Sequence, residues 1–498
     1  MSKRHSWPNQ FIYILAAIGC AAGLGNFWRF PMLAYEYGGA AFILAMLLSN
    51  IVIVFPLMML ETSIGQKAQA GPPKSMEKLK KGTGWIQWLA PLTIIGVLIY
   101  YVPIMAWGIT YLFDTFSGQF LEDPTNYFVT DILHLSADIN ETGTVQIAIL
   151  IALVVSYILI LLSLRKGIKS MSKVIKFTAT APFVILIILL IRAVTLPGAS
   201  IGLNAFFVPD WSQLGNPELW QAAISQSFFS ASLAMGYFIY AGGRRKETAE
   251  IPKTSLWILS GNFLVSILSG LVVFATLGFM AQEQGVDISE ATTSGPMLVF
   301  TVLPTAISMM PSFAIPFAVL LFLAVITLAI DSIFGMFEIA VASFMDLKKK
   351  HENEFFTFKI ILAVTFVLGI PITFNAGLYY LDIMDHFITG YMFMIVGFLE
   401  CFVVAYLVGP NKMRLWINTT ANGLRIGKWF NIVIYTLPLL LGSLLVFTFK
   451  NELADLYGDY PLWAIVCFGI VPLAIICITS AVLYRIMRTR AKVNDTQP

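Results

Sequence analysis

The sequence predicts an all-α protein that crosses a membrane about twelve times, because its composition is apolar and long apolar stretches recur along it. Of the 498 residues, 58% are hydrophobic and 12% are charged, and the mean hydropathy is +0.80. Soluble domains carry roughly 25% charged residues, and one membrane helix needs about 20 consecutive apolar residues. The expected spans lie near residues 11–35, 41–66, 88–115, 146–164, 174–195, 217–241, 254–281, 312–344, 357–374, 380–408, 430–449 and 461–484.

Basic residues gather in alternate connections between these spans. All lysines and arginines except Arg29, Arg192 and Lys450 fall in seven segments, at residues 3–4, 67–81, 165–176, 244–253, 348–359, 412–428 and 485–492. Cytoplasmic loops carry an excess of Lys and Arg. We therefore expect an integral multi-pass protein of the plasma membrane with both termini in the cytoplasm. The net charge of +3 then reflects topology, and we expect no nucleic-acid partner.

The sequence carries no motif of enzyme chemistry. It has no His/Cys metal spacing, no glycine-rich phosphate loop and no Ser/His/Asp constellation. The histidines are scattered at span ends and in loops, at His5, His134, His351 and His386. We therefore do not expect an enzyme.

Two expected spans contain residues that interrupt a helix. Residues 19–31 read GCAAGLGNFWRFP, with three glycines, an asparagine and an arginine at membrane depth, and the break of this span is expected at residues 19–26. Residues 226–237 read QSFFSASLAMGY. Secondary transporters bind substrate near the midplane with discontinuous helices, and irregular backbone at that depth survives only where it lines a polar cavity. The two spans are five apart, as an inverted repeat of spans 1–5 and 6–10 requires. Ordinary helix kinks are the alternative.

At these motifs the chain resembles the neurotransmitter:sodium symporter family and is similar to its bacterial amino-acid transporters of the leucine-transporter type. The motifs that carry the resemblance are GLGNFWRFP, IYYVP, QSFFSASL, NFLVSILSG, LAIDSIFG and LDIMD, in spans 1, 3, 6, 7, 8 and 10. The resemblance implies a transporter core at residues 11–408, with inverted repeats at about 11–195 and 217–408. A cytoplasmic gate segment at 1–10 would precede this core, and two further spans within 409–484 and a cytoplasmic tail at 485–498 would follow it. We expect a monomer or a weak homodimer.

The resemblance implies a site for a free amino acid. The positive end of a half-helix would bind the substrate carboxylate through the amides of Leu24 and Gly25, together with the hydroxyl of Tyr101. Backbone carbonyls would bind the ammonium group, and they would belong to Ala21, Phe229, Ser230 and Ser232. Monoamine members of the family carry an aspartate where this chain has Gly23, so the glycine favours a substrate that brings its own carboxylate.

The substrate side chain would lie in an apolar pocket that contains two flexible methionines. Its walls would be Val97, Tyr101, Phe229, Ser232, Met235, Ser332 and Met336. No acid or base belongs to this set, so we expect a neutral, apolar amino acid.

The resemblance also implies two sodium sites built from oxygen ligands, which hard cations prefer. The substrate carboxylate would join the first site, so sodium and substrate binding would favour each other. Its protein ligands would be Ala21, Asn26, Ser230 and Asn262. Those of the second site would be Gly19, Ala22, Leu328, Asp331 and Ser332. Asp331 lies inside the apolar run VITLAIDSIFGMF, where an acid needs a cation, a proton or a partner; a buried aspartate that holds a proton instead of a metal is the alternative.

Chloride is a further candidate ion. Four neutral polar residues, Gln226, Ser230, Asn262 and Ser266, would surround it, without the carboxylate that chloride-independent bacterial members often carry at the last position. Met46 replaces the tyrosine that normally contributes from span 2, and a thioether sulfur cannot donate a hydrogen bond. Two interpretations stay open: these groups bind chloride, or they bond one another and water.

Two gates are expected to bracket the site. The resemblance implies an outer ion pair between Arg29 and Asp385, with Tyr101 and Phe229 beneath it. The inner gate would be an ion pair between Arg4 and Asp346. Family members usually have Ser-Tyr near the inner end of span 6, where this chain has Gly243-Arg244, so the inner gate is expected to be weaker or organised differently.

The function that follows is sodium-coupled symport of a neutral amino acid by alternating access, with two sodium ions and with chloride as a further ion to be tested. Two alternatives remain. The protein could be a proton-coupled carrier or exchanger of the same fold, in which Asp331 titrates. It could also be an amino-acid sensor that binds its ligand without transporting it.

Overall fold

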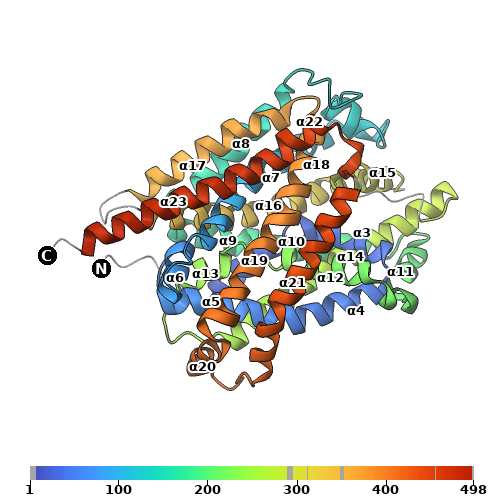
Figure 1. Ribbon diagram of the computed structural model, residues 1–498. Coiled ribbons are helices and arrows are strands. Elements are labelled where there is room, and N and C mark those ends of the chain that lie inside the picture. Colours follow the sequence, from blue (N-terminus) through green and yellow to red (C-terminus); the bar gives the residue numbers. More distant parts are fainter. Residues whose placement is uncertain (1–6, 289–294, 311, 348–352, 455, 496–498) are drawn as a thin grey trace.

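The computed structural model is a bundle of long helices and describes residues 7–288, 295–310, 312–347, 353–454 and 456–495 (Figure 1). The first half of the chain forms α1 Gln10–Ala21, α2 Leu24–Phe27, α3 Arg29–Glu36, α4 Ala40–Ser49, α5 Phe55–Ala68, α6 Pro72–Leu79, α7 Ile86–Thr115, α8 Ile147–Leu164, α9 Ile168–Thr178, α10 Ala181–Ala193, α11 Ala199–Phe207 and α12 Pro217–Ser230. The second half forms α13 Tyr237–Gly242, α14 Pro252–Gln284, α15 Leu303–Ser308, α16 Ala314–Met345, α17 Glu354–Gly369, α18 Gly377–Phe387, α19 Phe393–Phe402, α20 Pro410–Thr420, α21 Trp429–Ala454, α22 Leu462–Ala464 and α23 Val471–Asp495.

The helices agree with the expected all-α membrane fold. Ten continuous helical stretches of the described chain are long and apolar enough to cross a membrane, and an eleventh is a pair, Gln10–Ala21 and Leu24–Glu36, bent by 65° at its break. Their limits match eleven expected spans to within four residues, except that the last two run longer at their ends. The expected span at 217–241 is divided into α12 and α13 by residues 231–236, so the count of twelve stays a prediction.

Helix boundaries follow local sequence signals. Asn9 caps α1, where its side chain accepts a hydrogen bond from the backbone N–H of Ile12 at 2.8 Å. Asn216 caps α12 in the same way, ahead of a proline at the first helical position, where the missing N–H costs nothing. Helix α14 ends before Gly285, whose φ of 68° lies in the left-handed region that glycine adopts readily.

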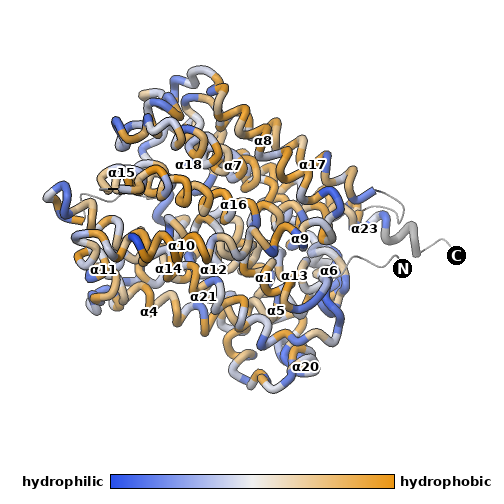
Figure 2. Tube along the Cα trace, turned by 180° about the vertical axis from the view of Figure 1, so that it is seen from behind, coloured by the Kyte–Doolittle hydropathy of each residue, from blue (hydrophilic) through white to orange (hydrophobic). Residues whose placement is uncertain are grey.

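The interior of the bundle is formed by α7, α14 and α16. In their most apolar 18-residue windows, 83% of the residues of α7 and 72% of those of α14 are buried, against 22% in α21 and α23. The last helices therefore present most of their apolar surface to the outside, where lipid would cover it. Apolar residues run along the helices, and hydrophilic residues gather toward the ends of the bundle (Figure 2).

Candidate substrate and ion site

The first span breaks at Ala22 and Gly23, between α1 and α2. Non-helical backbone is confined to these two residues, a shorter stretch than the expected 19–26. A β-carbon added to Gly23 would lie 2.8 Å from the Ser332 Oγ and 2.9 Å from the Tyr101 hydroxyl. The Leu24 N–H donates a hydrogen bond to that hydroxyl at 3.2 Å. The break therefore brings the buried start of α2, a tyrosine from α7 and a serine from α16 to one point.

The second break lies between α12 and α13. Ser232, Ala234 and Gly236 all have positive φ angles, of 52°, 58° and 74°, and such a conformation costs a non-glycine residue about 1–3 kcal/mol. Two contacts hold the segment: the Ala234 N–H donates to the Glu61 Oε1 at 2.8 Å, and the Ser232 hydroxyl donates to the Cys20 carbonyl at 3.3 Å. The break is thus built into the fold, because a buried carboxylate of α5 satisfies its backbone.

The two breaks meet in the centre of the bundle. A β-carbon added to Gly25 would lie 2.4 Å from the Phe229 ring, so this glycine is required for the aromatic side chain to approach the backbone. The Cys20 carbonyl accepts hydrogen bonds from Ser232, and from Ser332 at 3.1 Å. The remaining expected pocket residues are buried in the same apolar core, at Val97, Met235 and Met336.

The residues expected at the first sodium site form one buried cluster. The amide nitrogen of Asn26 donates to the Asn262 Oδ1 at 2.9 Å, and the amide nitrogen of Asn262 donates to the Ser230 Oγ at 2.7 Å. The Asn26 Oδ1 is buried and accepts no hydrogen bond. A buried carbonyl oxygen without a donor is costly, and a cation would satisfy it. The backbone oxygen of Ala21, the other expected ligand, accepts a hydrogen bond from the Gly23 N–H at 2.9 Å and keeps one lone pair.

The chloride candidates belong to the same cluster. Asn26 also donates to the Ser266 Oγ at 2.9 Å, and the Gln226 side chain donates to the Gly25 carbonyl at 3.1 Å. Ser230, Asn262 and Ser266 therefore form one hydrogen-bonded cluster, and Gln226 bonds the neighbouring Gly25 carbonyl. Both interpretations of these residues stay predictions.

Four of the five residues expected at the second sodium site line one small cavity. Its volume is about 10 Å³, and its walls include Gly19, Ala22, Leu328 and Asp331. This volume is close to that of a single water-sized probe. The fifth residue, Ser332, lies one position beyond Asp331 and donates to Cys20.

Asp331 has one satisfied and one unsatisfied oxygen. Its Oδ1 accepts a hydrogen bond from the Thr178 hydroxyl, whereas its buried Oδ2 has no hydrogen-bond partner. A β-carbon added to Gly19 would lie 2.6 Å from that Oδ2. The free oxygen therefore faces the α1 backbone across the cavity. Within the described part of the chain, no group of three His, Cys, Asp or Glu side chains is arranged to hold a metal ion, so a cation here would depend mainly on neutral oxygens.

The structure does not join the expected outer gate pair. Arg29 donates to the Ser225 hydroxyl at 3.2 Å, and its guanidinium carbon lies 5.5 Å from the centre of the Phe229 ring. Asp385 instead accepts a hydrogen bond from Tyr100 at 2.7 Å. Each group of the expected pair is therefore engaged by another side chain.

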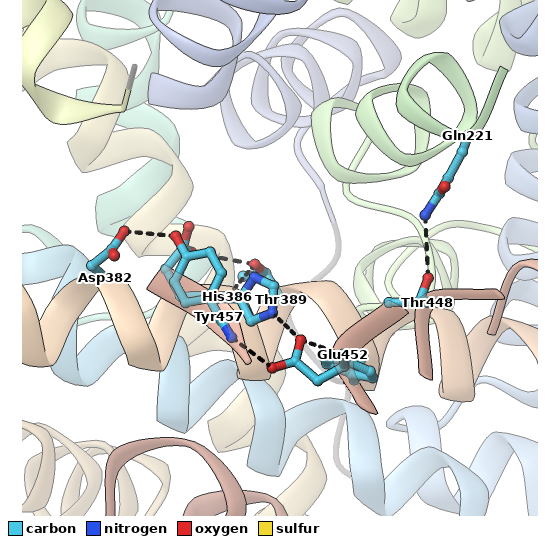
Figure 3. Close-up of polar contacts among 9 residues, drawn as sticks. Gln221, Asp382, His386, Thr389, Thr448, Glu452 and Tyr457 are labelled. Carbon is cyan, nitrogen blue, oxygen red and sulfur yellow. Dashed lines mark hydrogen bonds and ion pairs between the residues drawn. The ribbon is translucent and has the colours of Figure 1, made fainter. Parts of the chain in front are cut away.

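A cavity of about 180 Å³ lies beside Arg29 and Phe229, between α12, α18 and α21. Figure 3 shows the polar contacts near its wall. His386 lies 2.7 Å from the Glu452 Oε2, and its ring stacks on Tyr457 with 3.7 Å between the ring centres. Gln221 donates to Thr448 at 3.2 Å. These contacts tie α21 to α18 and to α12 next to the outer gate residues.

The inner end is organised around Arg244. Arg4 lies outside the described residues, so its expected pair with Asp346 has no structural description. Arg244 is 7% exposed, and its guanidinium lies 3.2 Å from the Glu354 carboxylate at the start of α17. Below it, the Tyr240 hydroxyl donates to the Glu338 carboxylate at 2.5 Å. The departure at Gly243-Arg244 therefore places an ion pair between the inner half of span 6 and α17, with the arginine buried and the glutamate 44% exposed.

The family is shown by comparison with known proteins. A model of the sodium:neurotransmitter symporter family matches residues 4–122 and 117–489, which together cover nearly the whole chain. The chain belongs to this family. It is 33% identical to an uncharacterized sodium-dependent transporter of Methanocaldococcus jannaschii, over 95% of this chain and 96% of that protein. It is 31% identical to a sodium- and chloride-dependent taurine transporter of Bos taurus, over 98% and 85%, and 31% identical to a human sodium- and chloride-dependent creatine transporter, over 82% and 71%.

Membership of the family decides the broad function. The protein is a sodium-dependent symporter and an integral multi-pass membrane protein, and it belongs among transporters rather than enzymes. The motifs of the broken spans had already indicated this family.

Several residues of the site were missed by the sequence reasoning. Glu61 supports the second break, Thr178 binds Asp331, and the Cys20 carbonyl joins both breaks. Glu61 gave a usable signal, because it is an acid inside the apolar run FPLMMLETSIG and such acids have functional partners. Thr178 and Cys20 gave none, since a threonine and a cysteine are ordinary residues in an apolar helix.

Proposed function

We propose that this symporter imports a neutral, apolar amino acid by alternating access. The supporting observation is the surroundings of Gly23, where the Leu24 N–H and the Tyr101 hydroxyl converge on a site with no room for an acidic side chain. The two groups bond each other at 3.2 Å, and a substrate carboxylate would replace that bond by accepting from both. An amine without its own carboxylate would find no countercharge there, because the residue at the break is a glycine.

The proposed substrate class rests on charge and on the relatives. No charged side chain belongs to the expected pocket set, and burying an unpaired charge is costly. The relatives named for taurine and creatine transport small zwitterions. A substrate that carries both an acidic and a basic group, as an amino acid does, is therefore compatible with the family. The apolar pocket adds the preference for an uncharged side chain, although one methylene changes binding by only about 1–3 kcal/mol.

We propose two sodium ions per cycle, one at the Asn26 cluster and one at the Asp331 cavity. Two charges that cross 100 mV gain about 4.6 kcal/mol, and a tenfold sodium gradient adds about 1.4 kcal/mol per ion. The total of roughly 7 kcal/mol would support about five decades of accumulation in the ideal limit. For the orientation we propose cytoplasmic termini in the plasma membrane, on the strength of the alternating basic segments.

We propose further that chloride enhances uptake. In support, the polar cluster around Ser266 holds neutral residues only, and the taurine and creatine relatives are named as chloride-dependent. Ser266→Glu would supply a fixed negative charge, so this variant is expected to transport equally well in chloride and in gluconate. Ser266→Ala, which adds no charge, is the matched control. Its uptake should not become independent of chloride, so its rate in gluconate should stay below its rate in chloride. Equal initial rates of the unmodified protein in both anions would rule the hypothesis out.

The experiment that tests the proposal is uptake into proteoliposomes across a panel of amino acids. Leucine, phenylalanine, alanine, glutamate, lysine and taurine would each be offered with an inward sodium gradient. Accumulation of leucine or phenylalanine, but not of glutamate or lysine, is expected. Preference for taurine or for a charged amino acid would overturn the substrate class.

The same preparation separates the two alternative functions. A proton-coupled carrier would accumulate substrate in choline when a pH gradient is imposed. A sensor would bind substrate in detergent and accumulate none in liposomes under any gradient. Sodium-driven accumulation at equal internal and external pH is the outcome expected here.

A further inference from the structure

A basic groove lies at the outer surface of the bundle, where α23 passes the start of α7. Its volume is about 530 Å³, and its walls are Trp85, Ala481, Tyr484, Arg485, Arg488 and Thr489. The Ser480 hydroxyl donates to the Trp85 carbonyl at 2.8 Å. A β-carbon added to Gly84 would lie 2.8 Å from the Met487 side chain. These close contacts hold α23 against α7, so the groove has fixed walls.

The two arginines of the groove have no acidic partner in the described part of the chain. They stand three residues apart, on one face of α23, and both are exposed. Glu77, the acid beside Tyr484, accepts hydrogen bonds from the backbone N–H groups of Gly82 and Gly84 at 3.0 and 3.1 Å. Its charge is therefore partly engaged by its own loop, and both guanidinium forks are free to bind an anion.

The length of the last span puts the groove at the depth expected for lipid headgroups. The apolar part of the last span covers residues 462–483, and at about 1.5 Å per residue this length is about 33 Å, close to the roughly 30 Å of a bilayer core. Arg485 and Arg488 follow directly after it. Trp85, which is 37% exposed, and Tyr484 supply the aromatic rings that favour this boundary. An anion held between the arginines would thus be attached to the membrane.

We propose that this groove binds the phosphate headgroup of an anionic lipid of the cytoplasmic leaflet. Arginine forks bind phosphate oxygens in a bidentate manner, and the two acyl chains would lie along the apolar outer face of α23. The same leaflet is the one expected to meet the basic segments of the chain. The proposal rests on that orientation and on the membrane fold, and it does not depend on which substrate is transported.

The test is a titration of the purified full-length protein in detergent with phosphatidylglycerol, followed by the melting temperature. Phosphatidylcholine and inorganic phosphate are titrated in parallel. They separate binding of an anionic lipid from binding of a zwitterionic lipid and from binding of a free anion. Each basic residue near an anionic surface contributes about 1 kcal/mol. The double variant Arg485→Gln/Arg488→Gln is therefore expected to raise the half-maximal phosphatidylglycerol concentration roughly 30-fold.

The matched control is Lys412→Gln/Lys428→Gln, which removes two exposed charges from another basic segment and is expected to shift the midpoint less than about twofold. Phosphatidylcholine and inorganic phosphate are expected to leave the melting temperature unchanged. The proposal is overturned if the half-maximal phosphatidylglycerol concentration rises less than about threefold in the arginine variant, or rises equally in the lysine variant. It is also overturned if phosphatidylcholine or phosphate changes the melting temperature as much as phosphatidylglycerol does.

Discussion

Replacing Asp331 by asparagine probes the proposed second sodium site with little change in shape. The amide oxygen of the new side chain can still accept the hydrogen bond from Thr178. The amide nitrogen would then occupy the position of the free Oδ2, which faces the cavity beside Gly19. The substitution removes the single negative charge of the cavity wall and points a donor at the proposed cation.

The expected loss follows from electrostatics. Two unit charges 4 Å apart interact by about 4 kcal/mol at an effective dielectric constant of about 20, which corresponds to roughly a thousandfold in affinity. Asp331→Asn is therefore expected to abolish sodium-dependent substrate binding at sodium concentrations that saturate the unmodified protein.

The assay is equilibrium binding of a radiolabelled substrate to the purified protein, titrated with sodium at constant ionic strength. Asp210→Asn, in an exposed loop, is the matched control and should keep the sodium midpoint. A melting temperature close to that of the unmodified protein would show that the Asp331 variant is folded. A sodium midpoint within threefold of the unmodified protein would refute the assignment of Asp331 as a sodium ligand.

Three further substitutions test the centre and the inner end of the protein. Tyr101→Phe should weaken substrate binding by about 1 kcal/mol, roughly fivefold, because one hydroxyl contact is lost, and the variant should stay folded with a slightly lower melting temperature, because the Leu24 N–H loses its acceptor; an unaltered substrate affinity would remove Tyr101 from the carboxylate site. Gly23→Ala should weaken substrate binding at least tenfold, because its β-carbon would come within 3.0 Å of two neighbours, and wild-type binding would show that the site can widen. Arg244→Gln should lower the melting temperature more than Glu354→Gln does, because Arg244 is the countercharge of the buried Glu338 as well as of the 44% exposed Glu354, and its removal leaves a buried carboxylate without a countercharge; equal effects would mean that Arg244 does not offset the charge of Glu338.

The sequence predicted the fold where periodicity and composition were decisive. Eleven span positions follow from apolar length alone, and both helix breaks follow from glycine and serine in runs that should be continuous. The breaks themselves were predicted less well. The sequence suggested an unwound stretch from Gly19 to Asn26, but helical hydrogen bonds resume at Leu24, because an isolated glycine is tolerated in a helix that neighbouring helices pack against.

The contacts between distant segments were beyond local reasoning. Glu61 and Ala234 are 173 residues apart, and Thr178 and Asp331 are 153 apart, so no spacing rule links them. Arg244 was noticed as an unusual residue, but its pairing with Glu354 depends on where α17 begins. The outer pair of Arg29 and Asp385 was expected from the resemblance, and in the structure the hydroxyls of Ser225 and Tyr100 bind these two groups instead.

The most direct test of the central claim, that sodium drives the entry of a neutral amino acid through the two broken helices, is the initial rate of leucine uptake into proteoliposomes. It should be measured with external sodium and with choline at equal pH, for the unmodified protein and for Asp331→Asn. Uptake that requires sodium and is lost in the variant is the predicted result. Equal uptake in sodium and choline, or full sodium-driven uptake by the variant, would contradict it.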